Sequence, residues 1–164
     1  MKTIYLLRHA KSSWDDPTLN DFDRPLNERG KRDAPFMGKK LKEKGIMPDL
    51  IVSSSAKRAS KTAKKVAAEI GYPKNKIEFQ EEIYEAFTKD LLRLVRGLDD
   101  QLQSVMVVGH NPEFTAFSNL LSDIHIYNIP TCGISCISFE TETWKDIDPQ
   151  TGKSLFFDYP KKYL

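Results

Sequence analysis

The sequence predicts an α/β fold: one domain over residues 1–164, a three-layer α/β/α sandwich around a mainly parallel sheet with an antiparallel edge strand. Two observations predict it. Short apolar runs of strand length alternate with longer segments that have helical periodicity. The chain then ends in two strand-like runs with no helix between them, which favours an antiparallel hairpin at one edge of the sheet.

Strands are predicted where apolar, β-favouring residues form short runs. They cover residues 3–7, 49–53, 76–80, 104–108, 133–139 and 155–159. The first run is Thr3-Ile4-Tyr5-Leu6-Leu7, which is too short to span a membrane and is typical of a buried strand. The turn-rich segment 148–152 is expected to lead into the last strand.

Helices are predicted between the first five strands, with ends set by capping residues. They cover residues 27–44, 56–70, 88 or 90 to 98, and 112–121. The expected N-caps are Asn27, Ser54-Ser55 and Asn111, the last followed by Pro112 as a first helical residue. Gly45 and Gly71 should end the first two helices, and Pro35 should kink or break the first one.

Composition excludes several functional classes. The net charge of +2 gives no overall field that would favour nucleic acid, and no stretch has the features of a signal peptide or the length of a membrane span. Lys and Arg outnumber Asp and Glu between residues 24 and 65, which is either a set of solvated helix faces or a basic surface for an anionic substrate. Cys132 and Cys136, both placed in one strand roughly 13 Å apart, predict reduced thiols and a cytoplasmic protein.

Polar side chains follow three of the predicted strands. Arg8 and His9 follow the first, Arg58 begins the helix after the second, and His110 follows the fourth. Because carboxyl ends of parallel strands meet at one edge, these four residues are expected at a common rim. Two guanidinium groups, two imidazoles and two helix N-termini there suit a phosphate dianion without a metal or other cofactor. A neutral imidazole can accept a phosphoryl group and pass it to water.

Three motifs resemble the histidine phosphatase (phosphoglycerate-mutase-like) superfamily. They are Leu7-Arg8-His9-Ala10, Ser54-Ser55-Ala56-Lys57-Arg58-Ala59, and Val108-Gly109-His110-Asn111-Pro112. Within the superfamily the chain is most similar to the small SixA-type phosphohistidine phosphatases. The resemblance implies that His9 accepts the phosphoryl group, that Arg8 and Arg58 hold the phosphate, and that His110 donates to a phosphate oxygen. Asn111, directly after His110, is a further candidate for substrate binding.

Two site assignments stay open. Glu85 best matches the general acid of many relatives, with Glu82 second, and either could be an ordinary loop carboxylate. A phosphohistidine substrate lessens the need for an acid, because its P–N bond breaks easily once the leaving imidazole is protonated. Arg24 either contacts phosphate or substrate, or pairs with Asp21 or Asp23, and the structural role is favoured. His125 is expected to be a surface residue.

The leading functional interpretation is a cytoplasmic, monomeric phosphatase of signal transduction. Its partner would be a phosphorylated protein, such as a histidine-phosphotransfer domain, with no nucleic acid or membrane. The short chain leaves little room for a lid, so we expect an open pocket that suits a phosphate on another protein. The alternatives are a small-molecule phosphomonoesterase or phosphoglycerate-mutase-like enzyme, and a non-catalytic phosphate-binding module. A cysteine phosphatase is excluded because no Arg stands six residues after Cys132 or Cys136.

Overall fold

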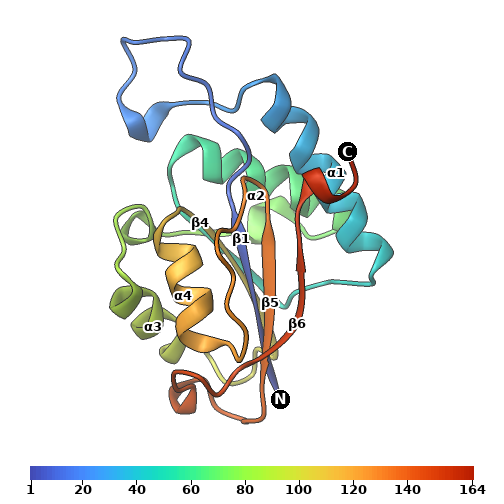
Figure 1. The fold of residues 1–164 in the computed structure, drawn as a ribbon, viewed down its shortest axis with the longest axis vertical. Helices are drawn as coiled ribbons and strands as arrows, with labels where there is room; N and C mark the ends of the chain where they lie inside the picture. Colours follow the sequence, from blue (N-terminus) through green and yellow to red (C-terminus); the bar gives the residue numbers. More distant parts are fainter.

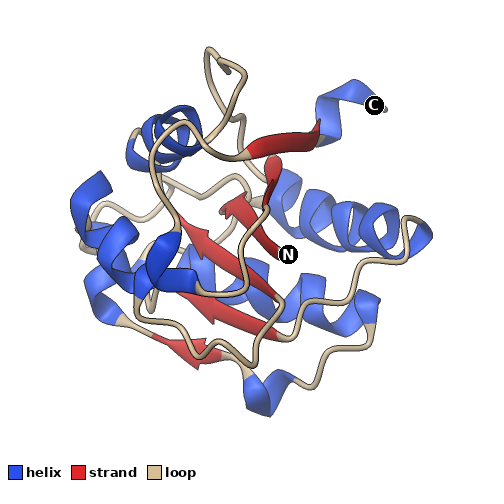
Figure 2. Cartoon of the chain, turned by 90° about the horizontal axis from the view of Figure 1, so that it is seen from below, coloured by secondary structure: helices blue, strands red, loops and turns tan.

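The protein, described over residues 1–164 by a computed structural model, is a six-stranded sheet with helices on both faces (Figures 1 and 2). The strands are β1 (Lys2–Arg8), β2 (Leu50–Ser53), β3 (Glu78–Phe79), β4 (Ser104–Gly109), β5 (Ile134–Phe139) and β6 (Lys153–Asp158). The helices are α1 (Glu28–Glu43), α2 (Lys57–Ile70), α3 (Thr88–Arg96) and α4 (Glu113–Leu121). The mainly parallel α/β sandwich predicted from the sequence is therefore confirmed.

The strand order is β3-β2-β4-β1-β5-β6. The first four strands in this order pair in parallel, and β5 is antiparallel to both of its neighbours, β1 and β6. The final hairpin thus supplies the antiparallel edge. Arg8 lies opposite Gly109 in the register of β1 with β4, and Ser53 lies opposite Val108 in that of β2 with β4. The carboxyl ends of these three strands consequently meet at one rim, at the top of Figure 1.

The two faces of the sheet bury two separate cores, as the alternating direction of strand side chains requires. On β4, Met106 and Val108 pack with α1 and α2, while Val105 and Val107 pack with α3 and α4. These central strands are covered on both faces and read as continuous apolar runs, which is typical of parallel sheets.

Helix α1 corrects two expectations, one about Pro35 in its interior and one about its C-terminal end. It continues through Pro35 as one helix, so the predicted kink or break does not interrupt it. Its buried face, which includes Met37 and Leu41, packs into the core, and that tertiary contact outweighs the unfavourable helix propensity of proline. The C-cap is Lys44 rather than Gly45, which follows it with a φ of 74°. Asn27 is the N-cap as predicted, and its side chain accepts from the Gly30 amide.

The starts of the next helices also differ from the prediction. Ala56 is the N-cap of α2 and makes no side-chain capping bond; the Ser54 hydroxyl accepts from the Ala56 amide, one residue before the helix. Pro112 is the N-cap of α4, after a cis Asn111–Pro112 bond, rather than its first residue. Asn111 still satisfies an early amide of that helix, because its side chain accepts from the Thr115 N–H.

Only one of the two cysteines lies in a strand. Cys136 is in β5 and Cys132 is in the preceding turn with a φ of 61°. Both are buried free thiols, as predicted. The Gly133 amide closes this turn by donating to the Pro130 carbonyl at 2.8 Å, and the Cys132 amide donates to the His9 carbonyl, which fixes the turn against the end of β1.

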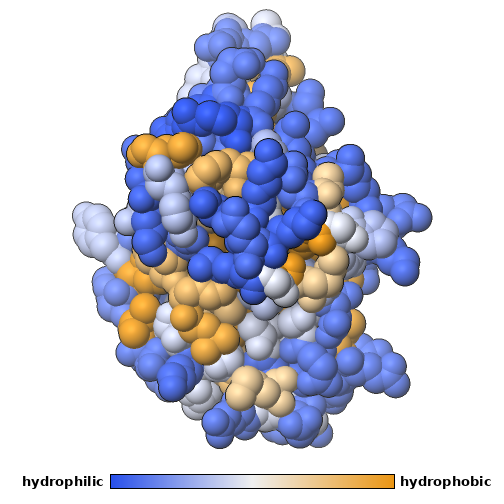
Figure 3. Space-filling model, turned by 90° about the vertical axis from the view of Figure 1, so that its right-hand side faces the viewer, coloured by the Kyte–Doolittle hydropathy of each residue, from blue (hydrophilic) through white to orange (hydrophobic).

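The surface is largely polar, and none of the helices combines the length and apolar content that crossing a bilayer requires. Figure 3 shows the side that carries β6 and α1, where hydrophobic side chains gather near the middle among hydrophilic ones. Leu155 on β6 and Leu164 at the chain end are among the exposed apolar residues. Lys153 at the start of β6 places a charge on this open edge, which opposes pairing with another strand.

The loop between β1 and α1 extends over the rim (Figure 1) and is closed at its base. Ser12 and Leu26 form an antiparallel bridge, and the Asn27 amide donates to the Lys11 carbonyl at 3.0 Å. Gly30, in the first turn of α1, lies against the same carbonyl. A Cβ at Gly30 would meet the Lys11 oxygen at 2.1 Å, so only glycine fits there.

Gly30→Ala is therefore expected to lower the free energy of unfolding by about 1–3 kcal/mol, the range for forced overpacking against a group that cannot rotate away. Urea titration followed by circular dichroism measures this change. Gly97→Ala is the control, since its Cβ would approach no atom closer than 3.4 Å and should change stability by less than about 0.5 kcal/mol. Equal stability of Gly30→Ala and the natural protein would contradict the close contact.

Candidate active site

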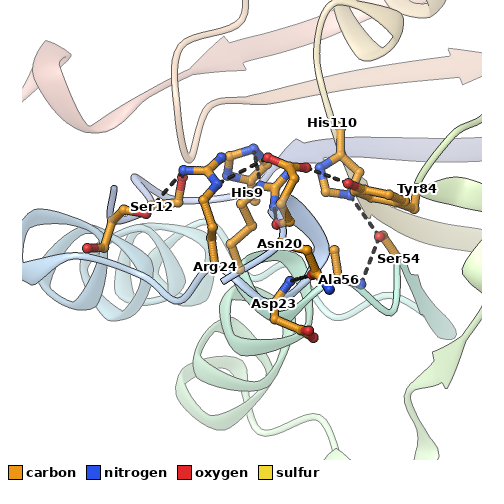
Figure 4. Close-up of polar contacts among 12 residues, drawn as sticks. His9, Ser12, Asn20, Asp23, Arg24, Ser54, Ala56, Tyr84 and His110 are labelled. Carbon is orange, nitrogen blue, oxygen red and sulfur yellow. Dashed lines mark hydrogen bonds and ion pairs between the residues drawn. The ribbon is translucent and has the colours of Figure 1, made fainter. Parts of the chain in front are cut away.

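The predicted rim residues lie together at the carboxyl ends of β1, β2 and β4. His9 directly follows β1, Arg58 lies in the first turn of α2, and His110 directly follows β4. The two imidazole rings have centroids 5.2 Å apart, and Arg58 Nε is 3.4 Å from His9 Nε2. Figure 4 shows the His9 and His110 rings side by side, with Tyr84 beyond His110.

The position and protonation pattern of His9 follow from its contacts. Its Nδ1 is 2.7 Å from the Ala10 carbonyl, which can only accept, so Nδ1 carries the proton in the neutral ring. Nε2 then holds the lone pair, and Arg58 Nε–H faces it. The Ala10 amide in turn donates to the Thr62 hydroxyl, which holds this segment against α2. The neutral ring therefore presents a nucleophilic nitrogen toward Arg58.

Both histidines stay neutral at physiological pH because they are buried. Burial lowers the pKa of His9 from 6.5 to about 3, aided by the nearby charges of Arg58 and Arg8, although the Ala10 carbonyl acts in the opposite direction. Burial likewise lowers the pKa of His110 to about 4, again with Arg58 contributing. Desolvation disfavours the charged imidazolium, so a lone pair is available without deprotonation.

His110 is fixed by Ser54, which the sequence indicates as a helix cap and not as a contact of His110. Its Nε2 lies 2.8 Å from the Ser54 hydroxyl, which already accepts from the Ala56 amide. With the hydroxyl proton directed to Nε2, the Nδ1 of His110 carries the ring proton. This Nδ1 is buried and has no hydrogen-bond partner in the chain. An anion oxygen is the partner such a donor lacks.

Arg8 lies on the other side of β4 from Arg58 and is partly buried. Its Nη1 donates to the Ile129 carbonyl at 2.9 Å, while its Nε is the second buried side-chain atom without a partner. Burial lowers the pKa of its guanidinium. Arg8 and Asn111 line one shallow hollow with the start of α4. The Asn111 amide group donates to the Asn128 side chain and to Ile129, so in this structure it organises the loop beside Arg8.

Arg58 contacts an acidic residue that the sequence prediction mentioned only as a partner for Arg24. Asp21 accepts from Arg58 Nη1 through its main-chain oxygen at 2.6 Å and from Nη2 through its carboxylate at 2.9 Å. The same carboxylate accepts from Arg24 Nε at 3.1 Å and from the Tyr84 hydroxyl. Arg24 is buried beneath the exposed Trp14 ring. The favoured structural pairing of Arg24 with Asp21 is thus present.

Glu82 and Glu85 form no hydrogen bond or ion pair with this cluster. Both are exposed and line a hollow with Phe22 and Tyr84. The carboxylate that bonds to the cluster is that of Asp21, whose pKa is lowered to about 2, with the Tyr84 and Arg58 hydrogen bonds outweighing desolvation. Asp21 is therefore ionised at neutral pH and holds no proton to donate.

The pocket is more covered than the short chain led us to expect. His9, Arg58 and His110 are 8%, 6% and 6% exposed, because Asp21 and Tyr84 lie over them. Asp21 comes from the loop between β1 and α1 and Tyr84 from the segment between β3 and α3, so this cover needs no inserted domain. The chain brings together no group of three or more His, Cys, Asp or Glu side chains that could hold a metal ion. His125 is exposed, as expected.

Comparison with known proteins identifies the family and a relative of this chain. The family model of the histidine phosphatase superfamily (branch 1) matches residues 4–91. An uncharacterised chloroplast protein of Arabidopsis thaliana is 30% identical over 153 residues, which cover 88% of this chain and 70% of that one.

Solved structures agree over nearly the whole chain. A candidate phosphohistidine phosphatase SixA from Agrobacterium tumefaciens is 30% identical, with a TM-score of 0.81 and coverage of 97% of this chain and 98% of that one. The protein histidine phosphatase SixA solved with tungstate has a TM-score of 0.85 over 99% of both chains at 18% identity, and it shows the shared fold. The chain is a member of the histidine phosphatase superfamily.

Proposed function

We propose that this phosphatase removes the phosphoryl group from phosphohistidine on another protein, through a covalent phosphohistidine at His9. The observation that carries the choice of substrate is the lack of a proton donor beside the nucleophile. Asp21 is ionised by its ion pairs, and the pKa of the Tyr84 hydroxyl is raised by burial and by its bond to Asp21. A phosphate ester needs a donor for its alkoxide, whereas a phosphohistidine needs none when its second ring nitrogen already carries a proton.

The reaction follows from the protonation state of His9. The Nε2 lone pair attacks phosphorus, the P–N bond of the substrate breaks, and its electron pair returns to a neutral leaving imidazole. The positive charge that forms on His9 is stabilised by its Nδ1–H bond to the Ala10 carbonyl. Arg58, Arg8 and the free Nδ1–H of His110 stabilise the phosphoryl oxygens. Water then attacks phosphorus, the P–Nε2 bond breaks, and inorganic phosphate leaves.

A lysine face beside the rim supports a protein as the phosphate donor. We define it as Lys57, Lys61 and Lys65 of α2 with Lys31 of α1, which line one hollow. The three α2 lysines form no ion pair, and Lys31 pairs only with an exposed glutamate. Helix α2 begins next to the pocket, since Arg58 follows Lys57 directly. A phosphorylated protein whose phosphate reaches Arg58 would lay its own surface over this face, and an acidic surface would fit it.

Two further assignments belong to this proposal. The free thiols of Cys132 and Cys136 support a cytoplasmic site of action, where thiols stay reduced. We assign the protein to signal transduction as part of this proposal, and a phosphorylated histidine-phosphotransfer domain is the probe with which we would test it.

The central test offers such a phosphorylated domain and, separately, an alkyl phosphate ester such as glycerol phosphate, whose alkoxide leaving group needs a proton donor. The natural protein should dephosphorylate the domain with a kcat/KM at least about 100-fold above that for the ester, a difference of about 2.7 kcal/mol in the barrier. His9→Ala should lose turnover of both. Faster turnover of the ester would contradict the phosphohistidine assignment, and turnover retained by His9→Ala would contradict the covalent route.

The pH dependence should reflect the buried histidines. With a pKa of about 3, only about 1% of His9 would be protonated at pH 5. Nitrogen-detected NMR should therefore show His9 protonated at Nδ1 alone from pH 8 down to pH 5. The unfolded chain binds protons near pH 6.5 and the folded one does not, so the free energy of unfolding should fall as pH falls from about 7 toward 4. A His9 titration near pH 6.5 would refute this account.

Charge reversal tests the lysine face. Lys61→Glu with Lys65→Glu should raise KM for the phosphorylated domain about tenfold and weaken its salt dependence, because electrostatic steering is lost. Hydrolysis of phosphoramidate should not show this rise. Lys161→Glu with Lys162→Glu is the matched control, with the same change of net charge at exposed positions of the chain end. An equal effect of both pairs would show that only net charge matters.

A further inference from the structure

A carboxylate next to the arginine of a phosphate pocket needs an explanation, because it repels the phosphate. Asp21 occupies both terminal nitrogens of Arg58: Nη1 donates to its main-chain oxygen at 2.6 Å and Nη2 to Oδ2 at 2.9 Å. Arg58 is 6% exposed and Asp21 is exposed, so the contact covers the guanidinium from the solvent side.

The geometry of the guanidinium shows what this contact leaves free. A guanidinium can bind an anion through its end-on edge, Nη1 with Nη2, or through a side-on edge that includes Nε. Asp21 takes the end-on edge. The Nε–H points instead at His9 Nε2, 3.4 Å away. The side-on edge of Arg58 therefore faces the nucleophilic nitrogen, where a phosphoryl group under attack must lie.

Asp21 is itself held by two further donors. Its Oδ1 accepts from Arg24 Nε, and its Oδ2 accepts from the Tyr84 hydroxyl as well as from Arg58. Arg24 is buried, donates to the Ser12 hydroxyl at 2.9 Å and lies 3.4 Å from the centre of the Trp14 ring. A carboxylate with donors on both oxygens has one defined orientation, which it imposes on the next group in the chain of contacts.

We propose that Asp21 is a positioning residue for Arg58: it holds the end-on edge of the guanidinium so that the side-on edge faces the phosphoryl group on its way to His9. Arg24 and Tyr84 hold the Asp21 carboxylate in this orientation. This role concerns any phosphoryl substrate of the pocket, and it does not depend on the donor being phosphohistidine.

Two roles of Asp21, blocking the phosphate place and positioning Arg58, predict opposite effects of removing it on the binding of phosphate analogues. If Asp21 merely occupies the place of the phosphate, then removing it frees Arg58 and should tighten the binding of phosphate analogues. If Asp21 positions Arg58, removing it lets the guanidinium turn and should weaken the binding of phosphate analogues. The probes are phosphoramidate as a small substrate and orthovanadate as an inhibitor, both independent of any protein partner.

We expect Asp21→Ala to lower kcat/KM for phosphoramidate about 100-fold, the loss that a displacement of about 1 Å can cause, and to raise the inhibition constant of orthovanadate in parallel. Asp21→Asn should lose less, because its amide oxygen can still accept from Nη2. Asp23→Ala is the matched control: it removes the same charge from the same turn, and its side chain makes no hydrogen bond or ion pair, so it should behave as the natural protein. Tighter orthovanadate binding by Asp21→Ala, or unchanged kinetics, would overturn the proposal.

A double-mutant cycle separates positioning from a general structural effect. Arg58→Lys removes the bidentate guanidinium, so Asp21 has nothing left to orient. Adding Asp21→Ala to Arg58→Lys should then change kcat/KM by less than about twofold, well short of the loss in the natural background. A full additional loss in the double variant would show that Asp21 acts elsewhere, and would overturn the assignment.

Discussion

The active site depends on one set of hydrogen bonds, the parallel pairing of β1 with β4. The register places Arg8 opposite Gly109, so the two residues that follow, His9 and His110, leave the sheet side by side. The His9 amide donates to the Gly109 carbonyl at 3.0 Å, which extends the ladder into the site itself. A shift of one residue would turn every side chain of β1 to the opposite face and would carry His9 away from His110.

The same packing determines the chemistry. Two cores hold β1 and β4 from both faces, and the rim between them excludes water from the imidazoles. Burial is the main reason that both rings remain neutral, and a main-chain carbonyl then selects which nitrogen of His9 holds the lone pair. An imidazole is thus made a nucleophile by its surroundings alone, with no neighbouring base to deprotonate it.

Much of this could be predicted from the sequence, because strand ends carry their own signal. Arg8-His9 and Gly109-His110 each terminate an apolar run. Because the carboxyl ends of parallel strands lie at the same end of the sheet, the two pairs must come close together. Asp21 could not be predicted as a contact of Arg58, since it lies in a long loop whose path is set by bonds to residues distant in the sequence, such as those from Arg58 and Tyr84. The sequence predicts Ser54 as a helix cap because serine caps are common, and its hydroxyl both accepts from the Ala56 amide before α2 and bonds to His110.

The predicted helix boundaries differ from the observed ones for a related reason. Pro35 and Asn111 have strong local preferences, but the buried face of α1 and the turn after His110 obey contacts from distant parts of the chain. Glu85 was a reasonable candidate acid by its position in the sequence, and the fold directs it to an exposed hollow. Local propensity gives way where burial of a whole helix face, or closure of a site, contributes more free energy.

The closed base of the loop between β1 and α1 has a consequence for how such a protein can diversify. The bridge of Ser12 with Leu26 and the contact of Gly30 with Lys11 fix both ends of the loop beside the nucleophile. The segment from Asp15 to Leu19 lies beyond this closure and is exposed throughout. Because both ends of the loop are fixed, substitutions and insertions at this tip should leave His9 in place, so evolution or a protein engineer can change the tip without moving the pocket.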